Sequence, residues 1–273
     1  MTVIKKLLFL AVMSFILLLA ACGEEDAAGT GDGDMKLLED GKFTFAMSGL
    51  YKPFNYEEGG ELKGFDVEIG NAISEKLGLE ADPVTTPWET ILQSLKGDRF
   101  DAIIGSMAYT DERAKEVDFT RPYYLSGGTI FVGKDNDEIK TAEDLRGKKI
   151  GVVAQSTFWE VAEEYSDDLQ FYNSDVTALQ DLTVSGRLDA VITAPVVGYE
   201  AIEAGLEIKE TGDTWLFIEE ACIAVNKGNE ELVEALNAAI EEMIEDGTYE
   251  EISMNMFGVN LLEVETEGVD VYR

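Results

Sequence analysis

The sequence predicts an α/β fold built from two similar lobes. Strand and helix patterns alternate along the chain, which is typical of helices packed on largely parallel sheets. In addition, residues 97–104 (GDRFDAII) resemble residues 186–192 (GRLDAVI) after one deletion. Each copy follows an amphipathic helix and opens a buried strand. Two similar lobes explain this echo more economically than chance recurrence of a common helix-turn-strand unit.

The periodicity of apolar residues places the individual elements. Short apolar runs predict strands at 43–47, 102–105, 149–154 and 190–193. Apolar residues at helical spacing predict helices around 69–77, 88–95 and 232–244, the last ending at Asp246 and Gly247. A further helix is expected over 175–185, where Gly186 would end it.

The first 21 residues are typical of an export signal peptide. Lys5 and Lys6 precede an apolar stretch that meets the sequence LAAC at residues 19–22. This pattern resembles the lipobox of bacterial lipoproteins, which implies that Cys22 becomes the acylated N-terminus of the mature chain. Ordinary signal cleavage beside an incidental cysteine is the alternative. Residues 22–36 are rich in Gly, Asp and Glu and predict a flexible tether.

The composition excludes several functions. The net charge of −34 makes nucleic acid an unsuitable partner. With no histidine in the chain, histidine metal sites and histidine acid/base catalysis are absent, and we expect neither a metal nor a cofactor. With Cys22 acylated, Cys222 would be the one free thiol, and its apolar neighbours predict burial in a strand. No segment after the signal peptide is apolar enough to span a membrane.

Two strand-to-helix turns are suited to hold an anion. In the first, Thr110 is a good helix N-cap and Arg113 falls in the first turn, so backbone N-H groups and a guanidinium would point the same way. Arg113 can grip a carboxylate through two parallel hydrogen bonds. The alternative is a surface ion pair of Arg113 with a nearby acidic residue, namely Glu112, Glu116 or Asp118.

The second turn follows the strand at 149–154. Thr157 and Glu160 fit a capping box there, although capping alone would satisfy both residues. Aromatic residues fall near these turns, and their rings could enclose an aliphatic stem or lie over a cation. They are Tyr51, Phe54, Trp88 and Phe158. Burial in the core is the alternative role for such residues.

At these residues the chain resembles the bacterial extracellular solute-binding proteins of polar amino acid importers. This family includes glutamine-, histidine- and lysine/arginine/ornithine-binding proteins. The resemblance covers roughly residues 43–258. Its matching stretches are YKPF (51–54), GFDVEI (64–69), FDAII (100–104), TDER (110–113), DFTRPYY (118–124), DLRGKKIGV (144–152), RLDA (187–190) and DGTY (246–249).

The resemblance implies a two-lobed periplasmic-binding-protein-like fold (type II), with a ligand cleft between lobes joined by a two-segment hinge. Lobe 1 would comprise residues 37–127 and 222–262, and lobe 2 residues 128–221, with crossing segments near 126–130 and 218–222. It also implies a non-enzymatic, monomeric binding protein of an ABC importer, serving permease subunits from the extracellular face of the membrane or from a periplasm.

Individual site residues follow from the same match. Arg113 corresponds to the arginine that binds the ligand α-carboxylate, and Thr157 to a second donor to that group. Ser106 matches a first-lobe polar contact, while Tyr51 and Trp88 match the aromatic pair beside the ligand side chain. The complete expected site is Tyr51, Trp88, Gly105, Ser106, Ala108, Arg113, Thr157 and Phe158.

Departures from the family pattern leave the ligand open. Ala194 stands where an aspartate usually holds the α-amino group, Ser48 where some members have an acid, and Ala108 where a serine or threonine is usual. An ammonium group without acceptors would lose charge-assisted hydrogen bonds worth roughly 1.5–3 kcal/mol each. Ectoine-like or betaine-like solutes are therefore candidates beside amino acids.

Three further alternatives remain open, and one of them, a receptor domain that feeds a signalling protein, differs from an importer's binding protein only in its partner. Glu219, Glu220 or Thr193 could replace the missing aspartate, which would restore a site for an ordinary amino acid. The rival from another class is an enzyme similar to exported cyclohexadienyl dehydratases, which share the fold. That chemistry needs a positioned acid, and none stands out among the 55 acidic residues.

Overall fold

The computed structural model describes residues 35–212, 215–265 and 268–273. The predicted signal peptide, Cys22 and nearly all of the predicted tether lie outside these residues. None of the described helices combines the length and apolar character needed to cross a membrane.

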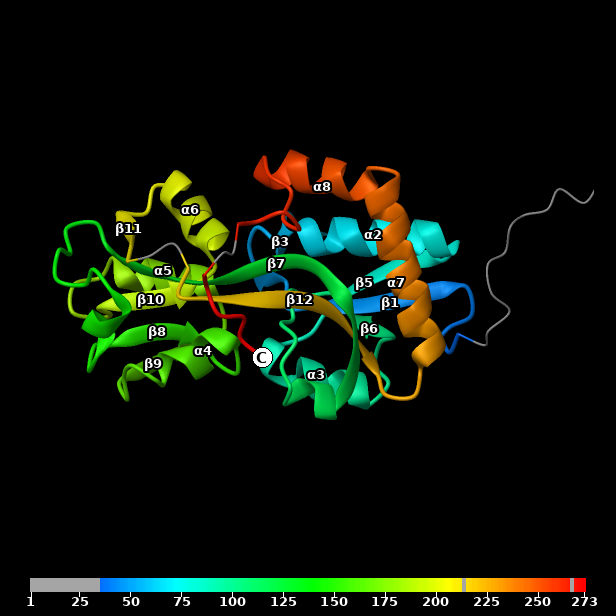
Figure 1. Cartoon of the computed structure of the whole chain (residues 1–273), viewed down its shortest axis with the longest axis horizontal. Helices are drawn as coiled ribbons and strands as arrows, with labels where there is room; N and C mark the ends of the chain where they lie inside the picture. Colours follow the sequence, from blue (N-terminus) through cyan, green and yellow to red (C-terminus); the bar gives the residue numbers. More distant parts are fainter. Residues whose placement is uncertain (1–34, 213–214, 266–267) are drawn as a thin grey trace, which may run out of the picture. The chain divides into compact units, whose positions relative to one another are not determined.

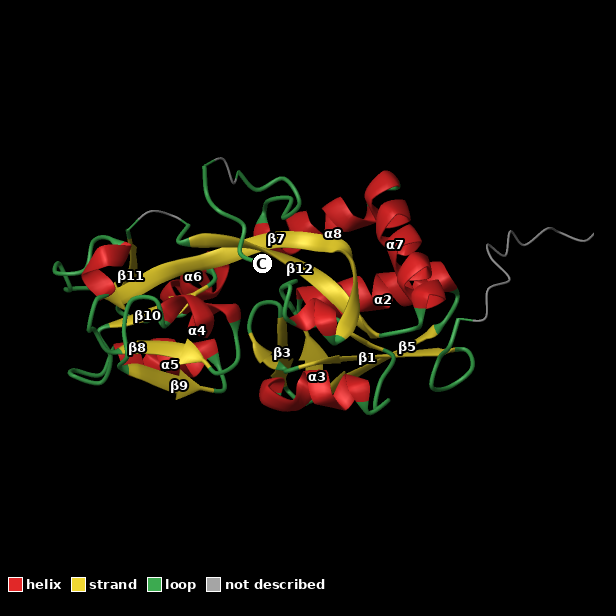
Figure 2. Ribbon diagram, turned by 60° about the horizontal axis from the view of Figure 1, so that its bottom comes forward, coloured by secondary structure: helices red, strands yellow, loops and turns green. Residues whose placement is uncertain are grey.

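Helices and strands alternate over the described chain (Figures 1 and 2). The strands are β1 (Lys42–Met47), β2 (Leu50–Tyr51), β3 (Asn55–Glu58), β4 (Glu61–Lys63), β5 (Glu80–Thr85), β6 (Ala102–Ile103), β7 (Val117–Gly133), β8 (Ile150–Val153), β9 (Leu169–Tyr172), β10 (Ala190–Thr193), β11 (Ile208–Thr211) and β12 (Phe217–Asn226). The helices are α2 (Phe65–Leu77), α3 (Trp88–Lys96), α4 (Thr157–Ala162), α5 (Asp175–Leu182), α6 (Pro195–Glu203), α7 (Glu230–Glu245) and α8 (Thr248–Phe257), with 3-10 turns η2 (Arg113–Lys115) and η3 (Ala142–Leu145).

The main sheet has three parallel strands at each of its ends. Its strands run β5-β1-β6-β12-β7-β10-β8-β9, with β11 beside β7, while β2, β3 and β4 form a separate small sheet. At one end β1 pairs in parallel with β5 and β6, and at the other β8 pairs in parallel with β9 and β10. The expectation of largely parallel sheets is therefore only partly correct, because β7 and β12 run antiparallel to their neighbours.

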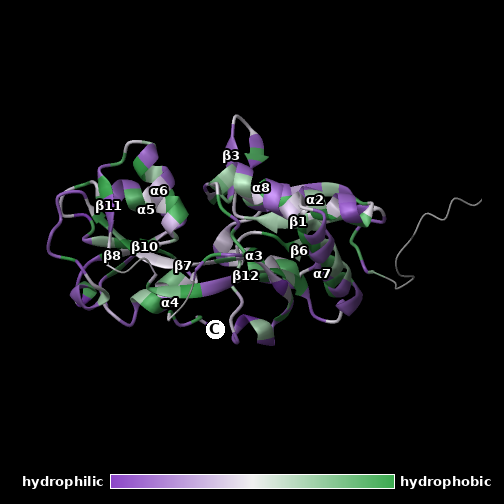
Figure 3. Cartoon of the chain, turned by 45° about the horizontal axis from the view of Figure 1, so that its top comes forward, coloured by the Kyte–Doolittle hydropathy of each residue, from purple (hydrophilic) through white to green (hydrophobic). Residues whose placement is uncertain are grey.

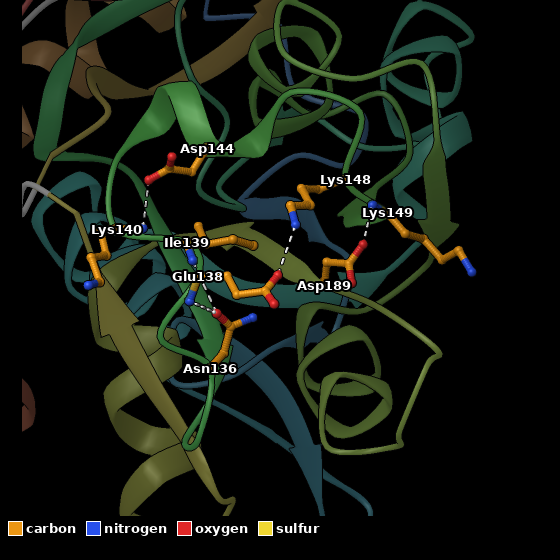
Figure 4. A network of polar contacts seen from close by, with 8 residues as sticks. All are labelled: Asn136, Glu138, Ile139, Lys140, Asp144, Lys148, Lys149 and Asp189. Carbon is orange, nitrogen blue, oxygen red and sulfur yellow. Dashed lines mark hydrogen bonds and ion pairs between the residues drawn. The ribbon is translucent and has the colours of Figure 1, made fainter.

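The sequence echo corresponds to this structural repeat. Asp101 precedes β6 and accepts a hydrogen bond from the backbone N-H of Thr44 at 2.8 Å. Asp189 precedes β10 and accepts one from the backbone N-H of Lys149 at 2.8 Å (Figure 4). Each aspartate thus ties the start of one central strand to the strand beside it. Both halves of the sheet thus contain an equivalent aspartate hydrogen bond. The predicted two-lobed α/β architecture is confirmed.

Strands β7 and β12 join the two halves. They pair from Val117 and Asn226 at one end to Gly128 and Phe217 at the other. The two strands approach so closely that a Cβ atom on Gly127 would lie 1.9 Å from the carbonyl oxygen of Phe217. Only glycine fits such a contact. The predicted crossing segments lie on these strands, while the numerical division into lobes remains a prediction.

Apolar side chains fill the space between the sheet and its helices. Hydrophobic residues recur along the strands, whereas peripheral loops are mostly hydrophilic (Figure 3). On α2, Phe65, Ile69 and Ile73 are fully buried and repeat every four residues, which gives the helix one core-facing side. Cys222 on β12 is also buried, as expected, and burial raises the pKa of its thiol to about 12.

The last described residues, 268–273, form a tail that lies along β12. Val271 bridges Ile218 in parallel, and the backbone N-H of Tyr272 donates to the carbonyl of Ile218 at 2.7 Å. The Tyr272 hydroxyl donates to Glu160 on α4 at 2.5 Å. The tail therefore connects β12 to the helix that begins at Thr157.

Candidate functional site

A cavity lies where several strands of both halves end. It encloses about 510 Å³ of empty space, including the part that opens to solvent. Its walls come from the segments after β1, β6, β8 and β9, the start of α3, the segment before η2, and β12. Carboxyl ends of strands are the usual place for ligands in open α/β sheets. The lining residues are Ser48, Leu50, Tyr51, Trp88, Gly105, Ser106, Ala108, Arg113, Val153, Ser156, Thr157, Phe158, Asn173, Asp175 and Glu219.

All eight residues predicted for the site line this one cavity. Tyr51, Trp88, Gly105, Ser106, Ala108 and Arg113 precede the middle of β7 in the chain, whereas Thr157 and Phe158 open α4 in the other half. Among the described residues, no group of three or more carboxylate or thiol side chains is arranged to hold a metal ion.

The guanidinium of Arg113 reaches both halves of the molecule. Its Nη1 donates to the carbonyl of Ala108 at 2.9 Å, and its Nη2 donates to the carbonyl of Gln155 at 3.1 Å. The group lies 5.7 Å from the centre of the Trp88 ring. Thr110 accepts a hydrogen bond from the backbone N-H of Arg113, but the expected helix is only the three-residue turn η2, whose N-cap is Glu112 and not Thr110.

The alternative of a surface ion pair for Arg113 is wrong. Its three proposed partners are engaged elsewhere: Glu112 pairs with Lys115, Glu116 with Lys96, and Asp118 with Lys227. Within the described part of the chain, Arg113 forms no ion pair of its own. Burial lowers the pKa of Arg113, while Glu219, Glu160 and Tyr272 raise it. A partly buried guanidinium without a carboxylate partner is suited to bind an anion.

The capping assignment in the second turn is wrong by one residue. Ser156, not Thr157, is the N-cap of α4, and its Oγ accepts the backbone N-H of Trp159 at 3.2 Å. Ser156 has the extended backbone that an N-cap needs, whereas Thr157 is already helical. The Thr157 hydroxyl is therefore free to donate to Glu219 Oε2 at 2.5 Å.

Buried polar contacts fix the side of the cavity that the segment after β6 forms. Ser106 has a positive φ of 58°, a conformation that few non-glycine residues adopt. Its Oγ donates to Asp66 at 2.8 Å, and its backbone N-H donates to the Tyr123 hydroxyl at 2.9 Å. Asp66 also accepts from Asn55 and Tyr123 at 2.6 Å each. Ser106 lines the cavity, and because its hydroxyl proton is committed to Asp66, its oxygen is left with the role of an acceptor.

Three of the four aromatic residues noted in the sequence line the cavity. Tyr51 stacks on Phe54 with ring centres 5.0 Å apart, and Phe54 stacks in turn on Tyr124 at 4.9 Å. Phe54 is buried and lies behind the wall that Tyr51 forms. Trp88 and Phe158 contribute the other rings. A cavity lined by rings with a few polar groups is typical of small-molecule sites.

Two buried carboxylates lie in the cavity wall. Asp175, which the sequence did not single out, accepts from the Thr193 hydroxyl at 2.6 Å. Burial raises the pKa of Asp175 to about 6 and that of Glu219 to about 7, and hydrogen bonds from Thr193 and Thr157 partly offset these shifts. The only signal for Asp175 was its place at the start of the helix expected over 175–185, which is α5 in the structure.

Of the three positions that depart from the family pattern, Ser48 and Ala108 line the cavity, whereas Ala194 does not. Ala194 is fully buried at the N-cap of α6 and is not among the lining residues. Of the three suggested replacements, Thr193 donates to Asp175 and Glu220 pairs with Arg273 at 3.0 Å. Glu219 alone of the three faces the cavity.

Comparison with known proteins identifies the family. The family model described as bacterial extracellular solute-binding proteins, family 3, matches residues 43–259. The L-cystine-binding protein TcyJ of Escherichia coli is 36% identical over 236 residues, covering 83% of this chain and 86% of that protein. The arginine-binding extracellular protein ArtP of Bacillus subtilis is 32% identical over 258 residues, covering 93% and 98%.

A solved structure agrees with these relatives. An ancestral arginine-binding protein bound to arginine superposes with a TM-score of 0.75 at 36% identity, covering 82% of this chain and all of that one. The relatives are binding proteins for amino acids, and the two-lobed fold is shared. The chain therefore belongs to the bacterial extracellular solute-binding proteins of family 3.

Proposed function

We propose that the protein captures a free amino acid in the cavity and delivers it to the permease of an ABC importer. The observation that carries this proposal is Arg113, whose guanidinium lines the cavity without a carboxylate partner in the described chain. A ligand carboxylate would supply that partner through charge-assisted hydrogen bonds. The names of the relatives, which bind cystine and arginine, support the same ligand class.

Binding would proceed by closure of the two lobes about the strands β7 and β12. We assign residues 37–127 and 222–262 to lobe 1 and residues 128–221 to lobe 2. Arg113 donates to Ala108 in the first and to Gln155 in the second, so the residue that binds the carboxylate also holds the lobes together. Hinge closure of this kind excludes water and completes the binding shell. The protein would act as a monomer without chemical conversion of its ligand.

Export and anchoring follow from the N-terminal sequence. We propose removal of residues 1–21 and acylation of Cys22, which would hold the binding domain at the outer face of the cell membrane by a flexible tether. Mass spectrometry of the mature N-terminus tests this. A mature chain that starts at another residue without acyl groups would overturn the anchor while leaving the binding proposal intact.

The central experiment is calorimetry with Arg113→Ala and a panel of the common amino acids, ectoine and glycine betaine. We expect Arg113→Ala to weaken binding at least about 100-fold, since two charge-assisted hydrogen bonds are lost. Arg187→Ala is the matched control, because Arg187 pairs with Asp181 away from the cavity.

Unchanged affinity in the Arg113 variant would remove this residue from the site. Tight binding of only ectoine or glycine betaine would refute the proposal that the ligand is an amino acid. Formation of phenylpyruvate from prephenate, followed by absorbance, would identify the dehydratase alternative instead.

A further inference from the structure

The charges around the cavity do not balance for a neutral amino acid. Among the described residues, its charged lining side chains are Arg113, Asp175 and Glu219. An amino acid with an uncharged side chain brings one carboxylate and one ammonium group. Arg113 and one acidic residue would neutralise these groups, and the second acidic residue would stay unpaired.

Neither carboxylate forms an ion pair with a lysine or arginine in the described protein. Asp175 and Glu219 are 5% and 4% exposed, and neither takes part in an ion pair there. Their side-chain donors are neutral hydroxyls, from Thr193 to Asp175 and from Thr157 to Glu219 Oε2. No described group donates to Glu219 Oε1. A buried carboxylate is unfavourable unless it is paired, so both groups favour a cationic ligand.

We propose that the cavity selects amino acids with a positively charged side chain, with Glu219 accepting the α-ammonium group and Asp175 accepting the side-chain cation. This inference rests on the proposed function and specifies its ligand. It assigns the ammonium acceptor to β12, in place of the position now occupied by Ala194.

The positions of the two carboxylates support these roles. Among the charged groups, Glu219 raises the pKa of Arg113 the most. The hydrogen bond from Thr157 places Glu219 at the start of α4. It is thus near the group that takes the α-carboxylate, where the α-ammonium must also lie. The Ser106 oxygen offers a second acceptor on the first-lobe side.

Asp175 lies on the wall shared with Tyr51. After burial and Tyr124, Asp175 is the next largest cause of the raised pKa of the Tyr51 hydroxyl. Ser174, beside Asp175, donates to the carbonyl of Leu50 at 3.1 Å, which brings the start of α5 against the segment that carries Tyr51. A side-chain cation there would meet a carboxylate and an aromatic ring together.

The same count disfavours cystine. Cystine carries two carboxylates and two ammonium groups, and its second carboxylate would need a second cation in the wall. No lysine or second arginine is among the described lining residues.

Arginine and citrulline give the sharpest test, because they differ by one charge at nearly equal size. We expect the unmodified protein to bind arginine about 30- to 100-fold more tightly than citrulline in calorimetry, the effect of one charge-assisted hydrogen-bonded pair. Asp175→Asn should reduce this ratio to near one by weakening arginine binding only. Glu219→Gln should weaken both ligands, because both carry the α-ammonium group.

Asp181→Asn is the control, since Asp181 lies on the same helix but pairs with Arg187 outside the cavity. Equal affinities of the unmodified protein for arginine and citrulline, or an unchanged ratio in Asp175→Asn, would overturn the inference while the amino acid function stands. Tighter binding of cystine than of arginine would overturn it too. Failure to bind any amino acid would instead refute the proposed function.

Discussion

At the scale of single residues, the site is a set of buried charges whose positions matter more than their number. The chain has 55 acidic residues, yet only Asp175 and Glu219 are described in the cavity wall. Arg113 has no ion-pair partner in its own segment of the described chain, because Glu112, Glu116 and Asp118 each pair with a lysine instead. The carboxylate-binding role proposed for Arg113 therefore follows from what its neighbours do.

The buried carboxyl of Glu219 should make the ligand-free protein less stable as pH rises. Its pKa is raised from 4.5 to about 7, first by burial, so the folded state holds a proton that the unfolded state releases. The free energy of unfolding then falls between about pH 4.5 and pH 7. Arg113 and Asp175 are the charged groups that act on it.

Glu219→Gln removes this loss of stability. We expect the variant to be more stable than the unmodified protein at pH 8, by about 3 kcal/mol at most, and nearly equal to it at pH 4. Urea denaturation at both pH values measures the difference. Glu220→Gln serves as the control, because Glu220 faces Arg273 rather than the cavity. An identical pH dependence in Glu219→Gln would show that Glu219 is ionised normally in the folded state.

At the scale of elements, the C-terminal tail lies beyond the part of the chain that the family model matches. The family match ends at residue 259, while the tail at 268–273 pairs with β12 and contacts α4. The Tyr272 ring lies 5.6 Å from that of Phe217, and Arg273 lies over Tyr109 at 5.7 Å. These contacts join β12, α4 and the segment before η2, the elements that surround Arg113.

Tyr272→Phe tests whether the tail stabilises the ligand-bound form. The substitution keeps the ring and removes the hydrogen bond to Glu160, worth about 1 kcal/mol, so ligand dissociation should become roughly fivefold faster in stopped-flow measurements. Tyr199→Phe is the matched control, because it removes a similar bond to Glu210 far from the cavity wall. Equal dissociation rates for the two variants would limit the tail to a structural role.

At the scale of the whole molecule, the net charge of −34 opposes folding through repulsion among surface carboxylates. Salt screens such repulsion over about 10 Å at 0.1 M and about 3 Å at 1 M. We therefore expect the midpoint of thermal unfolding to rise by several degrees between low salt and 1 M NaCl. A midpoint that does not change with NaCl would show that the acidic surface carries no net repulsive cost.

Much of the fold and part of the site were determined by the sequence itself. Helix and strand positions follow from periodicity, which is local, and Arg113 and Thr157 stood out because each follows a strand at a turn. The helix at Arg113 proved to be a short turn, and α5 ends at Leu182 rather than at residue 185. Such boundaries depend on a few hydrogen bonds that periodicity does not specify.

The convergence of charges was decided by the tertiary structure alone. Asp175 begins α5, and Glu219 on β12 was one of three candidates to replace the missing aspartate, but the local sequence does not show that both are buried beside Arg113. They meet Arg113 because β7 and β12 pair along their length and bring the ends of distant strands to one cavity. Burial depends on which distant segments pack together, so the unpaired carboxylates proposed to select the ligand emerge only when the chain is folded.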